Sequence, residues 1–207
     1  MPNFQARRRH RTGKGYLPPN PKQWENEHNG LDLREDLGIS LDCALPHEDA
    51  FDLLDRVTVL PHGALTEAQE SVDHFRGPGT GAWSGLALPR PDGTVLVLFN
   101  DSHPRTRIRA TLMEEFFHLR LEHRPTTIRV YSSDGGARSY NPSAESAAFG
   151  SGAAALVPFR ALKAMLQAGV APLQIARTFE VSEALVVFRL KVTKLYRSGR
   201  RLHAARP

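Results

Sequence analysis

The stretch Thr111-Leu-Met-Glu-Glu-Phe-Phe-His-Leu-Arg-Leu-Glu-His123 decides how the rest of this sequence is interpreted. Apolar residues recur through it at helical spacing, and no Gly or Pro interrupts it before Pro125. The stretch therefore predicts the main part of a helix that begins near Arg105. Glu114 and His118 are four residues apart, so their side chains share one face of that helix and can hold one ion.

The pattern that Glu114, Glu115 and His118 form, E-E-x-x-H, is one substitution away from H-E-x-x-H, the helix motif of zinc peptidases. A catalytic metal site needs three protein ligands and one open position. Glu114 and His118 supply two of them, and Glu145 is the best candidate for the third, because it stands early in the next predicted helix and small residues follow it. Glu115 then lies where a peptidase keeps the carboxylate that takes a proton from metal-bound water.

The motif also has interpretations other than a peptidase metal site. Glutamate pairs are common on amphipathic helices, and a lone histidine usually packs or hydrogen-bonds. One alternative is therefore that E-E-x-x-H is a chance sequence on a helix that binds no metal. Glu115 and His118 also form E-x-x-H, as in di-iron proteins, but the required second copy fails because Ala148 follows Glu145 at the histidine position. His123 lies about 140° further round the helix than His118, which favours a supporting or capping role over direct ligation.

Length and composition predict one domain, or one domain with a small appendage, in a chain of 207 residues. Apolar residues make up 41% and charged residues 24%, as in globular proteins that bury a core. The single cysteine, Cys43, excludes an internal disulfide, fits a reducing cytoplasm and is expected to be a buried small side chain. We expect a cytoplasmic protein without a membrane span or a secretory signal, because no apolar run is long enough.

The formal net charge of +5 is concentrated at the two ends. Residues 1–15 carry five basic and no acidic residues, and residues 196–207 carry four basic and no acidic ones. Without these nine, the chain has 18 basic against 22 acidic residues, so its body is slightly acidic. Such ends can touch nucleic acid weakly, although solvated tails are the simpler interpretation.

The rest of the chain divides into short elements around the central helix. Upstream the sequence predicts a polar segment over 1–25 that is disordered or extended, and a short helix from about Asn29 to Gly38. It then predicts a helix from Pro46 to Asp55, a strand from Arg56 to Leu60, a surface connection over 62–81, and a hairpin of strands Ala82 to Leu88 and Thr94 to Phe99. Downstream it predicts a strand from Thr126 to Ser132 with a turn at 134–136, a helix opened by Asn141-Pro142-Ser143, a helix from Pro158 to Gly169, and a helix-turn-helix rhythm over 172–196 with Ser182 as an N-cap.

The composition of two of these helices predicts how they pack against the rest of the domain. The stretch from Glu145 to Leu156 is rich in Ala and Gly, so a neighbouring helix, that of residues 106–123, can approach it closely. The last helix carries apolar residues on more than one face, which makes it core material and not an exposed DNA-recognition helix; these residues are Leu185, Val186, Phe188, Leu190 and Val192.

Three segments in order resemble the ImmA/IrrE family of metallo-endopeptidases, over roughly residues 30–196. The first, Arg107-Ile-Arg-Ala-Thr-Leu-Met-Glu-Glu-Phe-Phe-His118, is similar to the family's R-x-R-x-T-L-A-H-E-x-x-H helix. The second, from Glu145 to Pro158, is similar to E-x-x-A-x-x-F-A-A-x-L-L-x-P. The third, Phe179-Glu-Val-Ser182 followed by Phe188-Arg-Leu190, is similar to the F-x-V-S…R-L segment that ends the domain.

The resemblance implies an α+β fold with a small mixed or antiparallel sheet packed beside the active-site helix and a helical C-terminal part. The expected organisation is a basic tail over 1–28, a peptidase-like domain over 29–196 that ends in the helices of 170–196, and a basic tail over 197–207. Carried over by position, His118 and Glu145 match metal ligands and Glu115 matches the catalytic glutamate. Glu114 stands where the family normally has its first histidine.

What the resemblance implies for function is a metal-dependent endopeptidase that cleaves a regulatory protein, such as a helix-turn-helix repressor of phage-like, mobile-element or stress genes. Zinc is the expected ion, with manganese or ferrous iron as alternatives because a second carboxylate ligand hardens the site. Tyr131 and Tyr140 are candidates for stabilising the oxyanion. Three states stay open: an active peptidase with an altered metal site, an inactive metal-binding protein, and a metal-free regulator that acts by binding protein or DNA.

Overall fold

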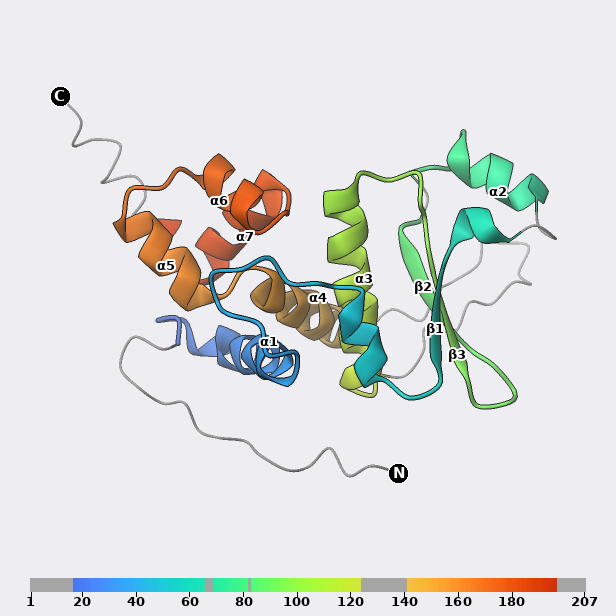
Figure 1. The fold of residues 1–207 in the computed structure, drawn as a ribbon, viewed down its shortest axis with the longest axis horizontal. Helices are drawn as coiled ribbons and strands as arrows, with labels where there is room; N and C mark the ends of the chain where they lie inside the picture. The colour runs from blue at the N-terminus through green and yellow to red at the C-terminus, as the bar shows by residue number, and fades with distance from the viewer. Residues whose placement is uncertain (1–16, 66–68, 82, 124–140, 197–207) are drawn as a thin grey trace.

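The structure, a computed structural model, describes residues 17–65, 69–81, 83–123 and 141–196 (Figure 1). The fold is α+β, as expected. Its α-helices are α1 (Trp24–Asp36), α2 (Gln69–Arg76), α3 (Arg105–Arg120), α4 (Pro142–Leu156), α5 (Phe159–Gln167), α6 (Pro172–Thr178) and α7 (Glu183–Val192). Its strands are β1 (Val57–Pro61), β2 (Gly85–Pro89) and β3 (Val95–Phe99), and short 3₁₀ helices are η1 (Pro21–Gln23), η2 (Asp49–Leu53) and η3 (His62–Ala64).

The sheet is small and mixed, with strand order β1-β3-β2. The predicted hairpin is confirmed, because β2 and β3 pair antiparallel with Leu86 opposite Leu98. Its turn carries Gly93 at a φ of 77°, a conformation that Gly adopts without strain. β1 pairs with β3 in parallel. The strand β2 therefore forms one edge of this sheet among the described residues.

Helix α3 stands between the sheet and the other large helices (Figure 1). It presents apolar side chains to both sides, and Met113, Phe116 and Phe117 are fully buried. Such burial of large side chains is the main stabilising contribution to a domain of this size. The helix that carries the motif is thus the centre of the core and not a surface element.

Helix α4 lies between α1 and α3, and its small residues bring it close to both. A Cβ added at Gly152 would lie 3.1 Å from the backbone of Met113 on α3. A Cβ added at Gly30 of α1 would lie 2.5 Å from the backbone nitrogen of Ala155. The predicted close approach of α3 and α4 is confirmed. Gly30 likewise allows α1 to pack closely against α4.

The C-terminal helices are core elements, as expected. Ser182 caps α7, and its hydroxyl accepts a hydrogen bond from the backbone N–H of Leu185 at 3.2 Å. Leu185, Val186 and Leu190 are buried, while the apolar side chains at 188 and 192 are half-buried. The apolar side chains of α7 therefore serve mainly the core, while Glu183, Ala184 and Lys191 are exposed.

Three expectations about the N-terminal third are wrong. Cys43 is exposed and not buried, because it lies in the surface loop that follows α1. Residues 46–55 form only the short η2, not a full helix. The first helix begins at Trp24, several residues before Asn29, because polar residues of its first half are buried in contacts with distant parts of the chain.

Several expectations fall on residues outside the described ranges. They are the strand at 126–132 with its turn at 134–136, the candidate oxyanion residues Tyr131 and Tyr140, and the basic residues at 1–15 and 197–207. The division into two tails and a domain over 29–196 stays a prediction. Within the described part of the chain, none of the helices has the length and apolar character that crossing a bilayer requires.

Candidate metal centre

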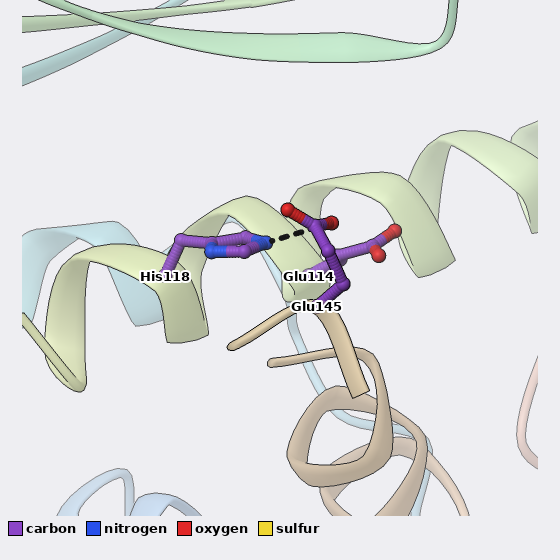
Figure 2. Close-up of side chains that lie close together, drawn as sticks. All are labelled: Glu114, His118 and Glu145. Carbon is purple, nitrogen blue, oxygen red and sulfur yellow. Dashed lines mark ion pairs between the residues drawn. The ribbon is translucent and has the colours of Figure 1, made fainter. Parts of the chain in front are cut away.

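Glu114, His118 and Glu145 converge at the contact between α3 and α4 (Figure 2). Glu114 and His118 lie one turn apart on α3, and Glu145 reaches them from the first turn of α4. One potential ligand atom from each residue lies within 4.8 Å of the other two. The Nε2 of His118 is 3.4 Å from a carboxylate oxygen of Glu145. The three residues that sequence reasoning selected as ligands are therefore neighbours in space.

The start of α4 explains why Glu145 points at α3. The side chain of Asn141 accepts hydrogen bonds from the backbone N–H groups of Ser143 and Ala144, at 3.1 and 3.3 Å. Pro142 occupies the first helical position, where its lack of an N–H costs nothing. This cap fixes the rotation of the first turn, and the Gly152 contact with α3 fixes the distance between the helices.

The site gathers two carboxyl groups, and its surroundings disfavour the ionisation of one of them, Glu114. The pKa of Glu114 is raised to about 7, first because burial disfavours the charged form and second because the Glu145 carboxylate is close. When no cation is bound, the Glu114 carboxyl group therefore keeps its proton to a higher pH than an ordinary glutamate. A divalent ion would remove this repulsion by placing positive charge between the oxygens.

The donor set fits a divalent metal ion. Two carboxylate oxygens and one imidazole nitrogen are ligands that zinc, manganese and ferrous iron all accept. All three side chains are half-buried, so they are partly shielded from water yet accessible. With three protein donors a tetrahedral ion keeps one position open, which is the property that separates catalytic from structural zinc sites.

Glu115 is not in this group of ligand atoms. Its side chain lies on the sheet side of α3, where a Cβ added at Gly85 of β2 would lie 3.4 Å from the Glu115 Cγ and 3.5 Å from its Oε1. One residue along a helix rotates the side chain by about 100°, which sets Glu115 beside the ligand face and not on it. The position suits a base that flanks the ion.

Gly85 is a site residue that sequence reasoning missed. A Cβ there would lie 2.5 Å from the Thr111 side chain as well as against Glu115, so only glycine leaves room for α3 to pack on β2. The available signal was an isolated glycine at the start of an apolar strand, which marks a close approach of another element.

His123 lies behind His118, in the supporting position expected from the sequence. The Nδ1 atoms of the two rings are 3.2 Å apart, a hydrogen-bond distance. The pKa of His123 is lowered, mainly by burial and then by the charge that His118 can carry. The neutral ring is therefore favoured at this position.

A comparison with models of protein families matches residues 68–191 to the IrrE N-terminal-like domain, a peptidase family. The match covers more than half of the chain and contains all of α3 and α4, and with them all the residues of the site. Searches of curated proteins and of solved structures found no match. The resemblance drawn from the three sequence segments is confirmed, and the chain belongs to the IrrE N-terminal-like domain family of peptidases.

Proposed function

We propose that this chain is a metal-dependent endopeptidase with Glu114, His118 and Glu145 as metal ligands and Glu115 as the general base. The observation that carries the proposal is the convergence of the three side chains from two helices within the matched family domain. Zinc is the first choice of ion, and manganese and ferrous iron are the alternatives that a harder, carboxylate-rich site admits.

In this proposal each residue has a separate task. A bound divalent ion would supply Lewis acidity and lower the pKa of water at the open position. Glu115, on the sheet side of α3, would accept the proton of the attacking water and pass it to the leaving amine. Glu114 and Glu145 together would balance the charge of a divalent cation, which makes the centre a weaker Lewis acid than one with two imidazoles.

The proposed substrate is a regulatory protein such as a helix-turn-helix repressor. The family resemblance supports this choice, and a peptidase of this kind acts on protein. The buried apolar side chains of α7 give the C-terminal helices a role in the core, and no observation supports the competing idea that the described part of the chain reads DNA through them. Weak DNA contact through the basic residues at the two ends is a separate proposal that a salt titration would test.

The first test is the metal content of the purified protein after incubation with zinc, manganese and ferrous iron. We expect near-stoichiometric metal in the wild type, loss of it in Glu145→Ala, and retention in Glu115→Gln, because Glu115 is not among the converging ligand atoms. Equal metal content in wild type and Glu145→Ala would contradict the three-ligand centre.

The second test is cleavage of a peptide library, followed by mass spectrometry. Products should depend on metal and disappear in Glu115→Gln, with a rate loss of about a hundredfold or more for removal of a general base. Glu114→His should raise the rate, because it restores the imidazole of the H-E-x-x-H motif. Metal binding without cleavage in both wild type and Glu114→His would favour the alternative function, a regulator that acts by binding protein.

A further inference from the structure

His123 owes its position to the way in which α3 ends. The backbone N–H of His123 donates to the carbonyl of His118 at 2.9 Å, and the N–H of Glu122 donates to the carbonyl of Leu119 at 3.1 Å. These two bonds form a Schellman motif, in which the residue after the C-cap adopts a left-handed conformation. That residue is Glu122, with a φ of 52°.

A left-handed residue at this place is usually glycine, since side chains make the conformation unfavourable. The strained turn has one visible consequence at the site: it folds the chain back so that the His123 ring lies against the His118 ring. The ring centroids are 5.1 Å apart and the ring planes are inclined at 72°. Strain that places a side chain at a metal centre is a reason to look for function in that side chain.

The His123 ring meets the nitrogen of His118 that does not face Glu145. The Nε2 of His118 is the atom near Glu145, at 3.4 Å, whereas its Nδ1 is the atom near His123, at 3.2 Å. His123 is therefore on the far side of the His118 ring from the converging carboxylates. It cannot share an ion with them, but it can determine which nitrogen of His118 carries the proton.

We propose that His123 is a positioning residue, whose Nδ1 accepts a hydrogen bond from the Nδ1–H of His118. This bond fixes the His118 tautomer that leaves Nε2 free to bind metal, and it holds the ring at the correct angle. The proton of His123 is then on its own Nε2. The inference rests on the proposed metal centre and adds a fourth residue to it, one that contacts neither metal nor substrate.

The test compares two substitutions of similar size that differ in one property. His123→Asn keeps an acceptor oxygen at the same number of bonds from the backbone as Nδ1, whereas His123→Leu keeps bulk but removes the acceptor. Zinc affinity is measured by competition with a chromophoric chelator. We expect the Leu variant to bind zinc about 10–100-fold more weakly, the range seen when such supporting partners are removed, and the Asn variant to recover most of this loss.

Glu122→Gln is the matched control, because it removes the neighbouring charge and leaves both rings and the turn in place. Its zinc affinity should equal that of the wild type. In the zinc-loaded wild type, nitrogen NMR should show a proton on Nδ1 of His118 and none on Nδ1 of His123. Equal zinc affinity of the Leu and Asn variants, or a proton on Nδ1 of His123, would overturn the inference while the metal centre stands. A wild type that binds no metal would instead overturn the proposed function, and this inference with it.

Discussion

The carboxyl group of Glu114 occupies the position of the first histidine in the H-E-x-x-H motif. At the scale of the single residue, the raised pKa of this group predicts how stability changes with pH. In the metal-free protein its pKa is about 7, against an ordinary value of 4.5. Between these two values the folded protein holds a proton that the unfolded chain has released. Stability must therefore fall as the pH rises through this window, by at most about 1.4 kcal/mol per pH unit, the limit for one proton.

Chemical denaturation of the chelator-treated protein from pH 5 to 7 measures this fall, and Glu114→Gln is the control. The amide has nearly the same shape but does not titrate, so its stability should change less with pH over that range. An equal fall in Glu114→Gln and in wild type would show that Glu114 ionises normally. Because metal binding needs the ionised carboxylate, zinc affinity of the wild type should rise over the same window.

At the same scale, some site residues could be predicted from sequence and others could not. Glu114 and His118 are recognisable because helical spacing alone places them on one face. Glu145 is recognisable because its helix start has clear capping chemistry at Asn141. The role of Gly85 depends on which strand packs against α3, and that pairing is decided by tertiary contacts that no local pattern encodes.

At the scale of the element, the end of α3 carries a conformational cost that can be removed. Glu122 is exposed and has a φ of 52°, and no described hydrogen bond involves its side chain. Glu122→Gly should raise the free energy of unfolding by about 1 kcal/mol, because glycine adopts this conformation without steric penalty. The result is measured by urea denaturation, with zinc affinity as a second readout that should stay within about twofold of wild type.

Glu122→Ala is the comparison that isolates the backbone effect. Glu122→Ala removes the same carboxylate but keeps a Cβ, so it should raise the free energy of unfolding much less than Glu122→Gly does. Equal stabilisation by Ala and Gly would mean that charge, and not the left-handed backbone, is the source of the effect. Loss of zinc affinity in Glu122→Gly alone would mean that the strain itself holds His123 in place.

The same scale shows which elements a sequence pattern can define. The hairpin, α3, α4 and α7 have strong start and stop signals, and each lies within a few residues of its predicted bounds. The sequence pattern predicts too late a start for α1 because Asn26 and Glu27 look like surface residues. Both are buried, and the partner of Glu27 is Arg189, 162 residues away, so local periodicity cannot reveal it.

At the scale of the whole molecule, the pair of Glu27 and Arg189 joins the first and last described α-helices. The Arg189 guanidinium forms an ion pair with Glu27, and the two side chains are 0% and 1% exposed. Arg189 also donates to the carbonyl of Val157 at 2.9 Å, and Glu27 accepts from the backbone N–H of Phe159 at 2.6 Å. The pair thus ties α1 and α7 to the junction of α4 and α5.

Arg189→Met should therefore destabilise the whole fold, by about 3–5 kcal/mol, because it leaves the Glu27 carboxylate buried without its counter-ion. That is a large part of the total stability of a typical domain, about 5–15 kcal/mol. The double variant, Glu27→Met with Arg189→Met, removes both charges and should recover a substantial part of the loss. Urea denaturation of the two single variants and the double variant gives the coupling energy. A double variant no more stable than Arg189→Met would show that hydrogen bonds to the backbone at Val157 and Phe159, and not the buried charge pair, hold α1 and α7 together.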